Sequence, residues 1–361
     1  MLRKPYGRTG KELTVIGCGG MRFAEPEKID ANAEVVLHAY ERGINYFDTA
    51  PGYCKDHSEE IVGAAVKQMA PGTFYVSTKC SSESGSKLTE SLERSLKRLN
   101  VEKIDFFHIW CVVTLDQWKR RGEAVKAALK AKEQGLVEHV AISSHLPGNE
   151  LKGVLAEGHF EGVTLGYSAI NFPYRQEAVE SAGRMGLGVV AMNPLGGGLI
   201  PQNPERLDFL RGPNDGTVVD AALRFVVSSP HITTALVGFT TKQHVDEAVS
   251  AVEDFQPYPP EHFERMKGSI IEAFDDLCTG CGYCLPCPQE VQIPKLMDAY
   301  NHLLLGGNRD SMRSRLKWHW GLSPEAAAAC SMCGECEDKC TQHLPIRERM
   351  KLISEIDEGE G

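Results

Sequence analysis

Short apolar segments alternate with amphipathic helical patterns from the N-terminus to about residue 253. The apolar segments predict eight strands, at residues 15–18, 46–49, 74–78, 104–110, 137–143, 162–167, 188–193 and 234–238. The stretches between them, such as DANAEVVLHAYERG and SEEIVGAAVKQM, repeat apolar residues at three- to four-residue spacing, which is typical of amphipathic helices. Eight strand–helix units in succession predict an α/β fold, the (β/α)8 TIM barrel. An open doubly wound sheet is less consistent, because GCGG at 17–20 is not a dinucleotide-binding fingerprint.

The pattern changes at DFQPYPPEH, residues 254–262, where three prolines within four positions rule out a continuous helix. Beyond it, EHFERMKGSIIEAFDDL, IPKLMDAYNHLLLG and SPEAAAAC predict further helices. We therefore expect a barrel over residues 1–254, a linker and helix over 255–277, and a mainly helical ferredoxin-like domain over 278–361.

Eight of the twelve cysteines lie between residues 278 and 340, in two closely spaced runs. The first run, followed by Pro288, is C-x2-C-x2-C-x2-C-P, and the second is C-x2-C-x2-C-x3-C. Three thiolates at this spacing reach three corners of a cubane, and the fourth turns toward a neighbouring cluster. The runs predict two [4Fe-4S] clusters, one on Cys278, Cys281, Cys284 and Cys340, the other on Cys287, Cys330, Cys333 and Cys336. Two zinc sites are the alternative, although zinc sites usually separate two C-x2-C pairs by a longer loop.

The chain has 361 residues and a formal net charge of -10, with no cluster of Lys and Arg. Binding to nucleic acid or to an anionic membrane needs such clusters. No apolar stretch approaches the length of a membrane span, and the N-terminus lacks a signal-peptide core. We expect a cytoplasmic protein whose partners are a small-molecule substrate and a redox protein, with no nucleic-acid or membrane partner.

The barrel's predicted active face lies at the carboxyl ends of its strands. Asp48 ends the second strand and Lys79 the third, so we expect them to form an interior ion pair, with Tyr53 on the loop above. A nearby ammonium favours the phenolate, so we expect Lys79 to lower the pKa of Tyr53 and make it a proton donor near neutral pH. Taken singly, each residue also has an ordinary structural explanation, such as a loop cap, a buried counter-ion or rim packing.

At these positions the sequence resembles the aldo-keto reductase family, in its subgroup with a C-terminal ferredoxin-like 4Fe-4S domain. The resemblance covers nearly the whole chain and is carried by YGRTGKELTVIGCGGMRF, DTAPGY followed by SEEIVG, STK, and NPLGGGLI. It implies a (β/α)8 barrel in which a nicotinamide cofactor, NADP or NAD, delivers hydride to a carbonyl. By position, Asp48, Tyr53 and Lys79 match three members of the family's catalytic tetrad, with Tyr53 as the acid.

The fourth member of the tetrad is a histidine in the family, and here that position is Trp110. An indole N–H can donate a hydrogen bond but can neither accept one nor titrate, so Trp110 either orients a carbonyl or fills the pocket. His108 lies two residues earlier on the same strand face, where a hydrogen-bonded core histidine is the more ordinary interpretation. We expect His145, at the end of the fifth strand, to act as a substitute polar group, and His57 is a weaker candidate.

The resemblance also implies a set of nicotinamide contacts, several of which differ from the usual family residues. Ser143 and Ser144 stand where the family has Ser-Asn, and Met192 stands at an aromatic stacking position. The residues implied to bind the cofactor are Ser143, Ser144, Thr164, Tyr167, Met192, Asn193, Leu195, Gly238, Thr240, Lys242 and Glu247.

These features predict an oxidoreductase of aldo-keto reductase type. Its barrel would reduce a carbonyl-type small substrate with NAD(P)H, and its clusters would carry electrons to or from a partner. A cubane moves one electron whereas a hydride carries two, so coupling the two processes requires the electron pair to be divided. One alternative is a non-catalytic electron-transfer or docking subunit with a degenerate barrel. Another is a plain carbonyl reductase with structural clusters.

Overall fold

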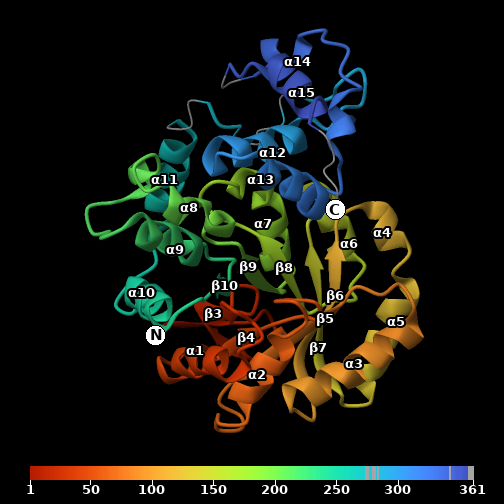
Figure 1. Cartoon of the computed structure of the whole chain (residues 1–361), viewed down its shortest axis with the longest axis vertical. Helices are drawn as coiled ribbons and strands as arrows, with labels where there is room; N and C mark the ends of the chain where they lie inside the picture. Colours follow the sequence, from red (N-terminus) through yellow and green to blue (C-terminus); the bar gives the residue numbers. More distant parts are fainter. Residues whose placement is uncertain (273–275, 279–281, 283, 341–342, 357–361) are drawn as a thin grey trace.

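Eight parallel strands close into a barrel (Figure 1), which confirms the predicted fold class. The computed structural model describes residues 1–272, 276–278, 282, 284–340 and 343–356. Each strand pairs with the next in sequence, and the last pairs with the first to complete the ring. The strands are β3 (Ile16–Gly19), β4 (Tyr46–Asp48), β5 (Tyr75–Cys80), β6 (Ile104–Val112), β7 (Val137–Ser144), β8 (Gly162–Gly166), β9 (Gly188–Met192) and β10 (Thr234–Gly238).

Helices surround the barrel because their apolar faces pack against the outer faces of the strands. The main ones are α1 (Ile29–Glu41), α2 (Ser58–Val66), α3 (Gly85–Leu99), α5 (Gly122–Glu133), α6 (Gly148–Ala156), α7 (Gln176–Arg184), α9 (Val218–Ser228) and α10 (Lys242–Val252). Two short helices, α4 (Leu115–Lys119) and α8 (Leu199–Gln202), lie in loops. Local signals fix helix ends: the Thr217 hydroxyl accepts from Asp220 N in a capping box that begins α9, and left-handed Asn100 ends α3.

The C-terminal part is mainly helical, as predicted. It contains α11 (Pro260–Glu272), α12 (Ile293–Gly306), α13 (Arg309–Arg315), a π-helical turn (Leu316–Trp320), α14 (Glu335–Asp338) and α15 (Ile346–Ser354). The helix predicted at 323–330 is wrong in length, because only Pro324–Ala327 forms a single 3₁₀ turn. This part has its own apolar core around Leu296, Met312 and Ile353.

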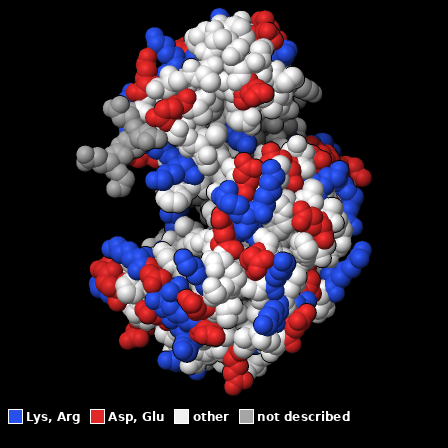
Figure 2. All heavy atoms as spheres, turned by 90° about the vertical axis from the view of Figure 1, so that its right-hand side faces the viewer, with Lys and Arg blue, Asp and Glu red and all other residues white. Residues whose placement is uncertain are grey.

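Helix α12 lies between the barrel and the end of the molecule that carries α14 and α15 (Figure 1), and it contacts both α8 and α15. On the face drawn in Figure 2, acidic and basic side chains are intermixed over the barrel, and the end with α14 and α15 shows an uncharged area bordered by acidic and basic side chains. Within the described ranges, we find no helix with both the length and the apolar character needed to cross a bilayer.

The closed end of the barrel is plugged by Tyr6, which lies between β1 (Arg3–Pro5) and β2 (Glu12–Thr14) of an N-terminal hairpin. The Tyr6 ring occupies a notch formed by two glycines. A Cβ atom at Gly162 would lie 1.9 Å from the Tyr6 hydroxyl, and one at Gly188 would lie 2.4 Å from its ring. The Tyr6 hydroxyl itself is buried without a hydrogen-bond partner among the described residues. Shape fit therefore holds the Tyr6 side chain in place, while hydrogen bonds hold only its backbone.

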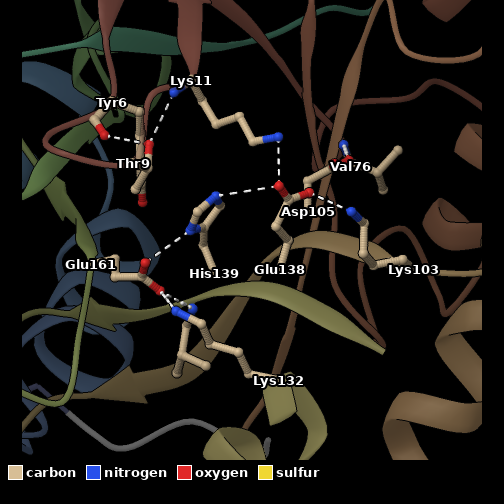
Figure 3. Close-up of polar contacts among 11 residues, drawn as sticks. Tyr6, Thr9, Lys11, Val76, Lys103, Asp105, Lys132, Glu138, His139 and Glu161 are labelled. Atoms are coloured by element: carbon tan, nitrogen blue, oxygen red, sulfur yellow. Dashed lines mark hydrogen bonds and ion pairs between the residues drawn. The ribbon is translucent and has the colours of Figure 1, made fainter. Parts of the chain in front are cut away.

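Charged side chains surround the plug at the same end (Figure 3). His139 bonds Glu161 at 3.0 Å and stacks on Phe106, while Glu161 also pairs with Lys132. Burial opposes ionisation of Glu161, but its bonds from His139 and Lys132 outweigh that effect and lower its pKa to about 2. The ring of charges stabilises the closed end, which in such barrels serves stability rather than catalysis.

We predict that Gly162→Ala destabilises the protein by about 1–3 kcal/mol, because the added methyl overpacks the Tyr6 notch. Tyr6→Phe alone should be neutral or slightly stabilising, since it removes a buried hydroxyl that has no partner. In the Tyr6→Phe background Gly162→Ala should cost less, and urea unfolding of the four proteins measures this coupling. Equal costs in the two backgrounds would show that the clash with the hydroxyl adds nothing to the clash with the nearest ring carbon, 2.3 Å from the added Cβ.

Candidate active site and cluster pocket

A buried ion pair lies inside the mouth of the barrel, as predicted. The Lys79 ammonium donates to Asp48 Oδ2 at 2.5 Å and to the Thr49 carbonyl at 2.7 Å, and both side chains of the pair are 2% exposed. Burial lowers the pKa of Lys79, and the Asp48 carboxylate opposes that shift. The pair arises because β4 and β5 are neighbours whose carboxyl ends meet at the same edge.

Tyr53 lies above this pair, but its expected electrostatics are wrong. The Lys79 nitrogen lies 5.1 Å from the centre of the Tyr53 ring, so it faces the ring. The pKa of Tyr53 is raised well above its usual value, first by burial and then by the negative charge of Asp48. Lys79 does not lower it, because its ammonium is engaged by Asp48 and Thr49. Tyr53 is therefore a fully protonated phenol at neutral pH.

Trp110 packs directly on Tyr53. Their ring centres are 5.4 Å apart and nearly perpendicular, an edge-to-face contact. The pairing of β6 with β7 shifts register between Ile109 and Val112, and Cys111 has a left-handed φ of 60°. A bulge of this kind redirects side chains next to active sites. Arg121 supports it by donating to the Trp110 carbonyl and to the Ser81 carbonyl.

His108 is a fully buried and hydrogen-bonded core histidine, in agreement with the more ordinary interpretation of the sequence. Its Nδ1 lies 3.2 Å from the Ser77 hydroxyl and its Nε2 lies 3.0 Å from the Thr164 hydroxyl. Ser77 in turn donates to Asp48 Oδ1 at 2.7 Å. Burial and the Lys79 charge lower the pKa of His108 to about 3, so it is neutral. Ser77, which sequence analysis missed, links the ion pair to this histidine.

His145 does not lie in this cluster of contacts. Its ring packs on His319 of the C-terminal part, with ring centres 4.3 Å apart. Burial, together with Arg175 and Arg315, lowers the pKa of His145 to about 3. This placement argues against its predicted role as a substitute acid or base. His57 pairs with Glu60 near the start of α2 and is half-exposed.

The contact between His145 and His319 belongs to a buried seam between the barrel and the C-terminal part. Arg175 donates to the Leu146 carbonyl at 2.5 Å and bonds His319 Nε2 at 3.0 Å, and its guanidinium lies 4.5 Å from the Trp320 ring. Asp298 accepts from Trp320 Nε1 at 2.7 Å and from Arg315 Nε at 2.6 Å. No motif around WHWG, residues 318–321, reveals this contact in the sequence.

A small cavity lies along the same seam. Its barrel side is formed by Asn193, Gly196 and Gly197 of the loop after β9, and its other side by residues around α12 that include Leu277 and Asn301. Gly196, Gly197 and Gly198 all have left-handed φ, a run that only glycine adopts readily. Arg22, which follows β3, donates to the Gly197 carbonyl at 3.1 Å and also contacts the Gly238 region. Sequence analysis also missed Arg22, although a charged residue just after the first barrel strand is expected at the active face and could have been noticed.

The residues implied to bind nicotinamide are only partly gathered around this loop. Asn193 lines the seam cavity and Leu195 precedes its glycines. The Thr240 hydroxyl donates to the Arg22 carbonyl at 3.0 Å, at the edge of the same region as Gly238. Met192 ends β9.

Other implied nicotinamide contacts have partners within the protein. The Thr164 hydroxyl bonds His108, and Ser144 Oγ donates to the Val112 carbonyl at 3.1 Å, while Ser143 is buried at the end of β7. Tyr167 donates to Gln176 and stacks on Phe225 in the layer between strands and helices. On the surface, Lys242 pairs with Glu34 and Glu247 bonds Gln243. Their roles toward a cofactor remain predictions.

Cysteines line a pocket in the C-terminal part, next to α14 and α15. Cys287, Cys330, Cys333 and Cys336, the four predicted to share a cluster, all border it, and so does Cys284, which was assigned to the other cluster. Cys278 and Cys340 lie on the same apolar core. Cys281 lies outside the described residues. Soft thiolates arranged around a void fit an iron–sulfur cubane, whose four corners stand further apart than the ligands of one ion. Among described side chains, no three metal-binding groups converge on a single-ion site.

A sequence profile of the aldo/keto reductase family matches residues 15–271, most of the chain. The chain belongs to the aldo/keto reductase family. A profile of the 4Fe-4S dicluster domain matches residues 277–344 directly after it, which supports an iron–sulfur cofactor in this family member and confirms the expected subgroup.

Known relatives agree with this assignment. L-galactose dehydrogenase from Arabidopsis thaliana is 26% identical over 293 residues, covering 70% of this chain and 88% of the relative. The NADH-specific methylglyoxal reductase of Escherichia coli is 24% identical over 238 residues, covering 59% of this chain and 72% of that enzyme. The fold matches holo aldo-keto reductase AKR11C1 from Bacillus halodurans, with a TM-score of 0.66 at 22% identity, over 74% of this chain and 96% of that one.

We predict that Asp48→Asn destabilises this protein by about 3–5 kcal/mol, because it leaves the Lys79 charge buried without its partner. The double variant Asp48→Asn/Lys79→Met should recover much of that loss, since no charge then remains buried. Thermal unfolding under anaerobic conditions measures both. A double variant as unstable as the single one would show that the charge pair does not account for the effect.

Proposed function

We propose that this protein is an oxidoreductase that reduces a carbonyl-type small substrate with NAD(P)H in the barrel. Its iron–sulfur clusters would carry electrons to or from a partner. The observation that carries the proposal is the arrangement at the mouth, where Tyr53 lies on a buried Lys79–Asp48 pair in a chain of the aldo/keto reductase family.

A nicotinamide cofactor, when bound, supplies hydride to the carbonyl carbon. The chain's own contribution is the proton. Tyr53 is protonated at neutral pH and can donate that proton to the carbonyl oxygen. Its raised pKa makes the phenol a weaker acid, so the transfer depends on the negative charge that develops on the carbonyl oxygen during reduction. The Lys79 ammonium neutralises the Asp48 carboxylate, whose negative charge would otherwise oppose formation of the phenolate. Trp110, packed on the Tyr53 ring, narrows the space in which a carbonyl can approach.

The loop after β9 is where the chain's residues fit the nicotinamide cofactor best. Three successive left-handed glycines leave backbone groups accessible, and the Arg22 guanidinium lies beside them. Helix α12 approaches the same loop across the seam cavity. A ligand on this loop would therefore lie near the C-terminal part, which supports coupling between the barrel and the clusters. A hydride delivered to the carbonyl takes both of its electrons with it, so the clusters would exchange electrons with a bound nicotinamide only in a separate half-reaction. In that half-reaction two cubanes can together hold the two electrons of one hydride.

One observation favours the alternative of a non-catalytic electron-transfer subunit. Trp110 replaces the family's titratable histidine, and the neutral His145 is held in the seam instead of replacing it. The two functions predict different behaviour toward reduced nicotinamide.

The first test mixes anaerobically purified protein with NADPH or NADH and a panel of aldehydes and quinones. Cofactor absorbance and cluster bleaching are followed together. We expect steady cofactor oxidation, and a decrease of about 10²-fold or more in Tyr53→Phe, the scale of a lost general acid. Tyr40→Phe, on α1 with its hydroxyl on Thr73, is the matched control and should keep full activity. No cofactor binding at millimolar concentration would favour the non-catalytic alternative.

A second test concerns the tryptophan. We predict that Trp110→His raises ordinary aldehyde reduction by about 10²-fold, because it restores a group that can donate, accept and titrate. Trp118→His, at a surface tryptophan that bonds Glu157, controls for the loss of an indole. If kcat/KM for aldehydes stays unchanged in Trp110→His, the tryptophan does not restrict the chemistry.

A further inference from the structure

Arg349 on α15 is a buried arginine with an unused donor. Its side chain is 5% exposed, and its Nη1 atom has no hydrogen-bond partner among the described residues. Its guanidinium lies over the Tyr300 ring of α12, 4.8 Å from the ring centre. A buried guanidinium N–H without an acceptor is costly. We therefore expect a bound group, absent from the polypeptide itself, to supply the acceptor for the Arg349 Nη1 donor.

The surroundings of Arg349 indicate what that acceptor is. Burial lowers the pKa of Arg349, and the groups whose negative charge opposes this shift are, in order, Tyr300, Asp276, Cys278 and Cys340. Tyr300 presents its ring to the guanidinium, and the Asp276 carboxylate is already paired with Arg206. Both cysteines are predicted ligands of the same cluster. Asn301, the next residue after Tyr300, accepts from Cys278 N at 2.8 Å and donates to the Cys278 carbonyl at 2.9 Å. The Asn301 side chain thus fixes Cys278 beside the helix turn on which Arg349 rests.

We propose that Arg349 donates a hydrogen bond to sulfur of the cluster held by Cys278 and Cys340, and thereby raises the reduction potential of that cluster. The proposal rests on the iron–sulfur part of the proposed function. Reduction adds one electron, and so one negative charge, to the cubane without making or breaking a bond. A fixed positive charge in a water-poor site stabilises that added charge more than it does at the surface.

The other cluster site differs in the charges around it. The pocket bordered by Cys330, Cys333 and Cys336 has Glu335 on its wall. The nearby Arg347 is half-exposed and already paired with Glu337 at 2.8 Å. Solvent and this carboxylate screen the Arg347 charge. The two cubanes should therefore have different potentials, with the Cys278 cluster the easier one to reduce.

This ordering gives the two clusters distinct places. Leu277, directly before Cys278, and Asn301 both line the seam cavity that faces the barrel loop. The other pocket lies by α14 and α15, at the end away from the barrel (Figure 1). The cluster that faces the barrel is thus the one that retains an electron more readily.

The test is an anaerobic redox titration with dithionite, followed by low-temperature EPR of the full-length protein. In Arg349→Gln the equilibrium constant for reduction of one cluster should fall about tenfold, a shift of about 59 mV for one electron, with the second cluster unchanged. Arg349→Lys keeps the charge and should recover most of the potential. Arg347→Gln is the matched control at the other site and should move either potential by less than half as much.

Iron analysis accompanies each variant, and about eight iron atoms per chain show that both cubanes are present. If Arg349→Gln loses iron, the comparison of Arg349→Lys with wild type decides. A lower potential and an altered EPR signal of one cluster in Arg349→Lys, smaller than the change expected for Arg349→Gln, would support the proposal, because the ammonium keeps the charge but changes the hydrogen bond. A potential and an EPR signal identical to those of wild type would overturn it. An equilibrium constant for cluster reduction in Arg349→Gln within about threefold of the wild-type value would also overturn the proposal. The titration needs no nicotinamide, so an inactive barrel would refute the proposed carbonyl reduction without affecting this inference. Wild-type protein that contains no iron would overturn this inference and the iron–sulfur part of the proposed function.

Discussion

The ion pair between Lys79 and Asp48 is the constraint on which the mouth of the barrel depends. Two opposite charges that are almost fully buried must stay together, because separating them would leave each without solvent or partner. Ser77 extends the pair to His108, and the Lys79 ammonium faces the ring of Tyr53. The position of the phenol therefore follows from a buried electrostatic requirement, and the surrounding strands provide the frame in which that requirement is met.

The barrel was predictable from sequence because each of its strands is a short apolar segment followed by a periodic helix. The pairing of Asp48 with Lys79 was predictable for the same reason, since both residues end neighbouring strands. The electrostatic state of Tyr53 was not. Sequence shows that a lysine is near a tyrosine, but not whether its ammonium faces the hydroxyl or the ring, or how deeply the phenol is buried. Here burial and the Asp48 charge determine the direction of the shift.

The seam was hidden for a different reason. His145 looked like a catalytic substitute because it ends a barrel strand, and nothing in the sequence placed His319, more than 170 positions later, against it. Contacts between distant segments depend on tertiary packing that local patterns do not encode. The same holds for Arg175 and for Asn301, whose side chain bonds both backbone groups of Cys278. The cysteine spacing identified the class of cofactor, but only the folded chain shows which neighbours surround each site.

Arg175 contacts both the barrel and the C-terminal part, and this has a consequence for the movement of one part relative to the other. Domains joined by a proline-rich linker usually swing relative to each other unless their interface is extensive. Here a hinge movement would have to pull the buried Arg175 guanidinium, which also bonds the Leu146 carbonyl on the barrel side, away from the His319 ring and the Trp320 face. These contacts favour one orientation of the C-terminal part, and with it a defined distance over which an electron would pass between this part and the barrel mouth.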